Sequence, residues 1–114
     1  MSIQIYCGKK NFDTQKAERF FKERRIPVQM LDLKKHPLGE REVRLMIQQI
    51  GLDRLMDRED KKAREHPACY YLQESLVIPA VQEAPWLLRT PIVRNGSRMT
   101  AGYCPEVWEQ WIGE

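Results

Sequence analysis

The chain has 114 residues, a length that suits one domain with a core that needs no disulfide crosslinks. Its 19 Lys and Arg against 16 Asp and Glu leave a net charge of +3, and the two signs are interspersed, which excludes a nucleic-acid-binding tail. The sequence has no apolar run of about 18 residues, so we expect no membrane partner. It also lacks the pattern of a signal peptide, and its three cysteines are an odd number. We therefore expect a cytoplasmic protein with reduced thiols.

The first third of the chain is predicted to form a strand, a helix and a second strand. Apolar and polar residues alternate over residues 2–6, as in a strand. Residues 13–24 carry Ala17, Phe20 and Phe21 at helical spacing, and either Asn11 or Asp13 is expected to cap this helix. Residues 28–33 form the second predicted strand. A strand–helix–strand unit implies a right-handed parallel crossover.

The middle of the chain is predicted to be helical. Residues 40–50 place apolar side chains at i, i+3, i+4 and i+7, and Gly51 ends this helix. We expect a short helical piece at 52–56, an exposed charged segment at 58–65, and a further helix at 73–82 that Pro79 kinks or restarts.

The last quarter is predicted to form a hairpin and a closing helix. Strands are expected at 91–94 and 97–100, joined by the turn signal Asn95-Gly96. Residues 105–112 form a helix whose Trp108 and Trp111 face the core. The whole order predicts one α/β domain over residues 1–114, with a thioredoxin-like fold and a helical insertion at about residues 38–88. In that architecture a proline opens the third strand opposite the first loop, and Pro91 after Thr90 holds this place, with the isomer of the bond left open.

Four blocks of sequence carry a family resemblance. They are Ile5-Tyr6 with Thr14, Lys16-Ala17 and Phe20-Phe21; Ile26 to Leu33 with Pro37-Leu38; Leu55 to Arg58; and Leu87 to Val93 with Gly102-Tyr103 and the C-terminal helix. In their order and spacing they resemble the arsenate reductase (ArsC) and Spx family of thioredoxin-fold proteins, over nearly the whole chain. The resemblance implies an ArsC-like fold and, for the reductases, thiol chemistry on an oxyanion.

The residues that carry this chemistry in the family are mostly replaced here. The reactive cysteine of the family corresponds to Asn11, and the second cysteine of Cys-x-x-Cys members corresponds to Thr14. An asparagine amide cannot form a thiolate or attack arsenate or a disulfide. The resemblance therefore implies a degenerate family site at Asn11, Thr14, Thr90 and Pro91.

The oxyanion-binding arginines of the family are also incomplete. The arginine directly before the strand proline corresponds to Thr90, with Arg89 one place away, and a second falls near Tyr103. Arg58 is the one position that matches. This pattern argues against arsenate reduction by the usual route.

Cys7 is the candidate replacement for the missing sulfurs, since it ends the first strand at the rim of the loop. Two interpretations stay open: a displaced catalytic thiol whose pKa is lowered by Lys9 and Lys10, or a structural cysteine. A disulfide between Cys7 and Cys104 also stays open.

Other residues suggest weaker interpretations. Lys9 and Lys10 precede a helix N-terminus and, with Arg58, form a candidate anion site. His66 and Cys69 lack the further ligands that a metal site needs, so no metal is expected. Tyr70, Tyr71 and Trp86 are predicted to pack rather than to form a recognition surface.

Three functions therefore compete. The preferred one is a redox-inactive or atypical ArsC/Spx-like protein that needs no cofactor and binds a protein partner, for which Spx relatives suggest RNA polymerase rather than direct contact with nucleic acid. The second is a thiol-dependent oxidoreductase that uses Cys7, with glutathione or a small thiol. The third is a module that binds a small oxyanion through Lys9, Lys10 and Arg58.

Overall fold

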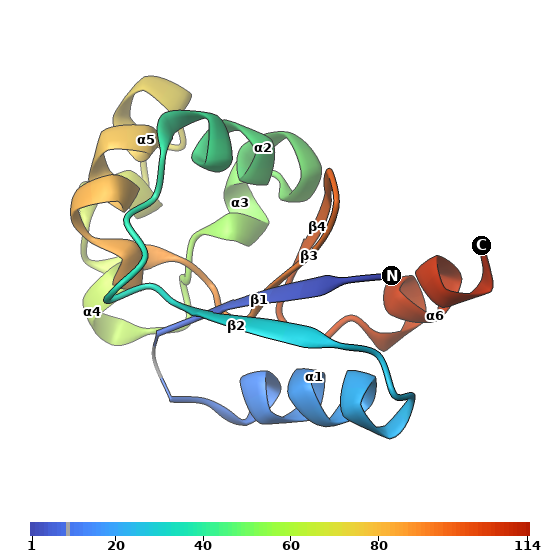
Figure 1. Ribbon diagram of the computed structural model, residues 1–114. Helices are drawn as coiled ribbons and strands as arrows, with labels where there is room; N and C mark the ends of the chain where they lie inside the picture. Colours follow the sequence, from blue (N-terminus) through green and yellow to red (C-terminus); the bar gives the residue numbers. More distant parts are fainter. Residues whose placement is uncertain (9) are drawn as a thin grey trace.

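The computed structural model describes residues 1–8 and 10–114, and its centre is a four-stranded sheet (Figure 1). The strands are β1 (Ile3–Cys7), β2 (Val28–Asp32), β3 (Ile92–Asn95) and β4 (Arg98–Ala101), and they lie in the order β2-β1-β3-β4. β1 pairs in parallel with β2 and antiparallel with β3, and β3 pairs antiparallel with β4. This is the mixed α/β, thioredoxin-like arrangement predicted from the sequence.

Two helices cover one face of the sheet. They are α1 (Phe12–Glu23), which lies below the sheet in Figure 1, and α6 (Pro105–Gly113), which lies at its right. Phe20 and Phe21 pack on the ring of Trp108, as the helical spacing predicted, with ring centroids 5.2 Å from it. Trp108 and Trp111 are buried in this layer.

The helical insertion covers the other face. It comprises α2 (Glu40–Ile50), α3 (Leu52–Leu55), α4 (Lys61–Arg64), the 3-10 turn η1 (Pro67–Cys69), α5 (Glu74–Glu83) and the 3-10 turn η2 (Pro85–Leu87). α2 has the predicted bounds, and Gly51 ends it with a positive φ of 94°. Pro79 lies inside α5. Figure 1 shows α2, α3 and α5 above the sheet.

Two short segments differ from the prediction. Met56 leaves the short helix because it pairs with Leu88 in an isolated antiparallel bridge. The segment 58–65 is not wholly exposed. It contains α4, whose Ala63 is buried because it packs in the insertion core, the apolar cluster between the sheet and the helical insertion.

The bridge at Met56 ties the middle of the insertion to the segment that leads into β3. The Asp57 amide donates to the Leu87 carbonyl at 2.8 Å, and the Arg89 amide donates to the Leu55 carbonyl at 2.8 Å. These bonds fix the backbone just before Thr90 and so help to position the residues opposite the first loop.

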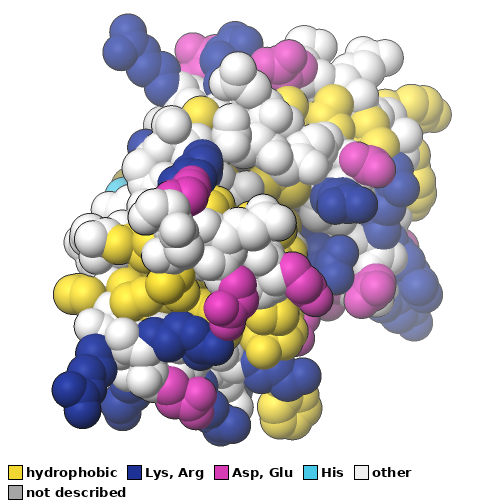
Figure 2. All heavy atoms as spheres, turned by 90° about the vertical axis from the view of Figure 1, so that its right-hand side faces the viewer, with side chains coloured by type: hydrophobic (Ala, Val, Ile, Leu, Met, Phe, Trp, Pro, Cys, Tyr) yellow, Lys and Arg dark blue, Asp and Glu magenta, His cyan; other side chains and the backbone are white. Residues whose placement is uncertain are grey.

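The surface carries charges of both signs. On the face that bears α6, seen in Figure 2, lysine and arginine side chains are interspersed with aspartate and glutamate. Over the described part of the chain, none of the helices is both long and apolar enough to cross a lipid bilayer.

Candidate functional site

The start of α1 is set by Asn11, which acts as the N-cap of the helix. Its backbone is extended, with φ −150° and ψ 161°. Its Oδ1 accepts hydrogen bonds from the Thr14 amide at 2.7 Å and from the Thr14 hydroxyl at 2.9 Å. An asparagine oxygen in this position satisfies an amide that the helix leaves without a partner. Of the two predicted cap residues, Asn11 is the correct one.

The other end of the Asn11 amide reaches the segment opposite the loop. Its Nδ2 donates to the Thr90 hydroxyl at 3.0 Å and lies 3.2 Å from the Thr90 carbonyl oxygen. Thr90 is buried, and its bond to Pro91 is cis. The structure thus brings Asn11, Thr14, Thr90 and Pro91 together, and the amide spans the place where the family resemblance puts a thiol.

Cys7 does not have the surroundings of an activated thiol. Its Sγ lies 3.7 Å from the Leu31 carbonyl oxygen, toward the neighbouring strand. Burial, together with the charges of Asp32 and Glu18, raises the pKa of Cys7. This direction is opposite to the lowered pKa expected for a displaced catalytic thiol, because burial disfavours the charged thiolate and the charges of Asp32 and Glu18 add to that effect.

The three cysteines are free thiols, so the disulfide between Cys7 and Cys104 is not formed. Cys104 directs its Sγ toward the Ala101 carbonyl at 3.3 Å. Burial raises the pKa of Cys104, although the charge of Arg89 acts in the opposite direction.

Of the candidate anion residues, the structure describes Lys10 and Arg58. Lys10 and Arg58 are exposed, and no described hydrogen bond or ion pair joins either of them to Asn11 or Thr90. Lys9, the third residue of that prediction, lies outside the described residues. Arg89 packs beside Gly102, where a Cβ would lie 3.2 Å from its Nε.

The His66 and Cys69 pair is structural. His66 caps η1, its Nδ1 accepting from the Ala68 amide at 3.1 Å, and Cys69 is buried. Among the described residues, no three His, Cys, Asp or Glu side chains are grouped as metal ligands. The prediction that Tyr70 and Tyr71 pack is wrong: they are 60% and 63% exposed, because the turn after η1 projects their rings into solvent.

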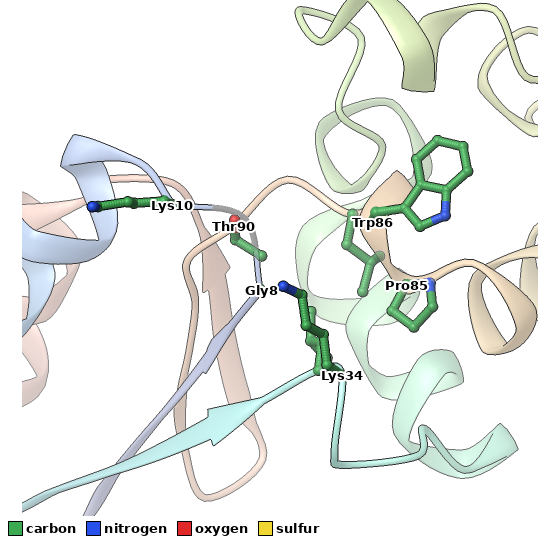
Figure 3. A pocket seen from close by; sticks show the side chains of 8 residues that line it. Gly8, Lys10, Lys34, Pro85, Trp86 and Thr90 are labelled. Atoms are coloured by element: carbon green, nitrogen blue, oxygen red, sulfur yellow. The ribbon is translucent and has the colours of Figure 1, made fainter.

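A cavity of about 400 Å³ opens between the first loop and the insertion. Its lining residues come from three separate parts of the chain: Gly8, Lys10, Leu33, Lys34, Pro85, Trp86, Leu88 and Thr90. Figure 3 shows Thr90 on one side and the Pro85-Trp86 turn on the other, with the side chain of Lys34 between them.

The model of the ArsC family matches residues 6–111, which is nearly the whole chain. The chain belongs to the ArsC family. Among curated proteins, none matches it.

Solved structures with this ArsC-family fold are distant in sequence. An arsenate reductase from Vibrio cholerae is 22% identical, with a TM-score of 0.78 over 96% of this chain and 97% of that chain. A YffB protein is 21% identical, with a TM-score of 0.79 over 95% of this chain and 96% of that one. An ArsC-related protein from Brucella melitensis is 18% identical, with a TM-score of 0.72 over 100% and 97% of the two chains. At these identities the likeness shows the fold.

Sequence reasoning missed one part of this ArsC-family site. Trp86 was predicted to pack, and its ring does lie near Lys62 and His66, but it also lines the cavity. The available signal was its position: Pro85-Trp86 comes a few residues before the strand proline, so this turn is held near the first loop.

Proposed function

We propose that this ArsC-family protein has no thiol catalysis at its first loop and acts by binding a protein partner. The observation that carries the proposal is the bonding of Asn11. Its amide oxygen caps α1 and its amide nitrogen bonds to Thr90, so the side chain has a structural role at the family's reactive position. An amide cannot supply the nucleophile that thiol chemistry needs.

The surroundings of Cys7 support the same proposal. The thiolate is the reactive form of cysteine, and a raised pKa reduces its population at neutral pH. The sulfur also points toward the β2 backbone rather than toward a proton acceptor that would activate it. The alternative, a thiol-dependent reductase that uses Cys7 with glutathione or another small thiol, is therefore less well supported.

Exposed aromatic side chains support the binding of a protein. Phe12, the first residue of α1, is 79% exposed, and Tyr70, Tyr71 and Tyr103 are exposed as well. Aromatic side chains are enriched at protein interfaces because they bury a large area at a low cost in conformational entropy. RNA polymerase is the partner that we propose, since Spx-type relatives bind it.

Two assays test the proposal. In the first, the purified protein is given arsenate or a small disulfide with glutathione as reductant, and we expect no turnover above the rate of a Cys7→Ser variant. Turnover that Cys7→Ser abolishes would overturn the proposal in favour of the reductase.

The second assay measures binding of RNA polymerase from the source organism to the immobilised protein. We expect binding that Phe12→Ala weakens and that Gln15→Ala, an exposed position on the same helix, leaves unchanged. Absence of binding by the unmodified protein would reject RNA polymerase as the partner.

A further inference from the structure

We propose that the cavity beside the first loop binds a small aromatic carboxylate. This inference goes beyond the binding of a protein partner and does not rest on it. The cavity combines apolar walls with two described lysines, Lys10 and Lys34, of which only Lys34 is directed between the walls (Figure 3), and its volume of about 400 Å³ lies in the range of small-molecule sites.

The walls of the cavity are apolar and are held in place. Leu33 and Leu88 are buried residues of the insertion core, so their positions are fixed by packing. Trp86 is half-buried, with the Lys62 ammonium 4.4 Å from its ring centroid and the His66 ring edge-on at 6.4 Å. These contacts limit the rotation of the indole before any ligand arrives, which reduces the entropic cost of binding.

Lys34 supplies the positive charge. The hydrogen bond from its amide to Asp32 Oδ1, at 2.9 Å, fixes its backbone at the end of β2. Figure 3 shows its side chain running toward Gly8, between Thr90 and the Pro85-Trp86 turn, whereas Lys10 extends away from the cavity. No ion pair among the described residues involves Lys34, so its ammonium remains available to an anion.

Thr90 adds a polar contact at the loop side. Its hydroxyl oxygen accepts from Asn11 Nδ2 at 3.0 Å, and within the described residues no acceptor takes the hydroxyl proton. That proton is therefore a second donor for a carboxylate oxygen. Asn11 fixes the hydroxyl in position, so the residue that replaced the family's cysteine orients one wall of the cavity.

The chemical class of the ligand follows from the apolar walls and from the polar donors of Lys34 and Thr90. An inorganic oxyanion would leave the apolar walls in contact with water, and a neutral aromatic molecule would leave the ammonium without a partner. Of the two described lysines that line the cavity, only Lys34 directs its ammonium between the walls, and one ammonium there balances one negative charge, which favours a carboxylate over a doubly charged phosphate ester. A flat ring against Trp86, Pro85 and the two leucines completes the fit.

The test uses 2-naphthoate as the probe, titrated into the ¹⁵N-labelled full chain and followed by NMR and calorimetry. We expect saturable shifts at the backbone amides of Gly8, Leu33 and Leu88 and at the Trp86 indole N–H, with little change at Trp108 and Trp111 in the other core layer. Shifts centred elsewhere on the molecule, or no saturable binding, would overturn the proposal.

Matched probes and variants separate charge from apolar contact. Lys34→Gln should weaken binding of 2-naphthoate about five-fold, the size of one ion pair near the surface, and Lys35→Gln should leave it unchanged. Neutral 2-naphthamide should bind more weakly than 2-naphthoate by a similar factor, and inorganic phosphate should not shift the Trp86 indole N–H. Equal effects of the two lysine variants, or equal binding of the amide or of phosphate, would contradict the proposed site.

Discussion

Asn11 and Thr90 are joined by a side-chain hydrogen bond of 3.0 Å although 79 positions separate them in the chain. The bond connects the start of α1 to the segment that enters β3. The same asparagine caps α1 through Thr14. One amide thus connects the N-terminus of α1 with the residue that precedes Pro91.

This double role predicts two separable losses of stability. Asn11→Ala removes the cap, worth about 1 kcal/mol, and the bonds to buried Thr90, worth about 1–2 kcal/mol, so its free energy of unfolding should fall by about 2–3 kcal/mol. Asn11→Asp keeps the cap oxygen but replaces the donor to Thr90 by an acceptor that faces the Thr90 carbonyl oxygen, so it should lose about 1–2 kcal/mol, all of it from the Thr90 side. Urea unfolding measures both values. An Asn11→Asp variant as stable as the original would mean that the Thr90 bonds contribute nothing.

A cysteine introduced at position 11 should be a reactive thiol. Asn11→Cys places a sulfur at the N-terminus of α1, where the helix dipole and free amides favour a thiolate. We expect its pKa to lie below that of an ordinary cysteine and its alkylation by iodoacetamide at pH 7 to be faster than that of Cys7. The rate, followed by mass spectrometry in a Cys7→Ser background, checks this prediction. A rate no higher than that of Cys7 would show that the loop no longer supports a thiolate.

The thiol of Cys7 should respond to its acidic neighbour. Asp32 pairs with Cys7 across β1 and β2, and its charge helps to raise the pKa of Cys7. Asp32→Asn removes that charge but keeps an oxygen for the Lys34 amide, so the pKa should fall and alkylation at pH 8 should become faster. Asp53→Asn, an exposed acid in the insertion, is the control and should leave the rate unchanged. No difference between the two variants would contradict the assigned cause.

Because Tyr6 is buried, the free energy of unfolding should fall at alkaline pH. The Tyr6 hydroxyl donates to Glu42 Oε2 at 2.6 Å, and burial together with Glu42 raises the pKa of Tyr6 from 10.0 to about 12. Tyr6 loses its proton at a lower pH in the unfolded chain than in the folded protein. Its contribution to the free energy of unfolding should therefore be complete below pH 10 and should fall as the pH rises toward about 12.

The matching variant is Tyr6→Phe, which removes this hydrogen bond. It should cost about 1–3 kcal/mol at pH 7, since the acceptor is charged, and should flatten the alkaline decline. Tyr71→Phe alters an exposed ring and should change neither quantity. Thermal unfolding between pH 7 and 11 tests this, and an unchanged slope in Tyr6→Phe would assign the decline to other groups.

Local sequence signals predicted the helices and strands well where the apolar residues recur at a regular helical spacing or where a single turn motif marks the end of an element. The apolar period of residues 40–50 and the glycine after them gave the bounds of α2, and Asn95-Gly96 gave the hairpin. Met56 was misplaced because its pairing with Leu88 is a contact between distant segments. Tyr70 and Tyr71 were misplaced because hydrophobic character alone does not say whether a turn faces the core.

The sequence by itself determined that position 11 holds an asparagine and that no thiolate can form there, because side-chain chemistry does not depend on the fold. Only the tertiary structure decided what the asparagine does. Its bond to Thr90, the acidic surroundings of Cys7 and the cavity beside Lys34 all depend on segments far apart in the chain. Distances and burial between such segments arise from packing, which no local pattern of residues records.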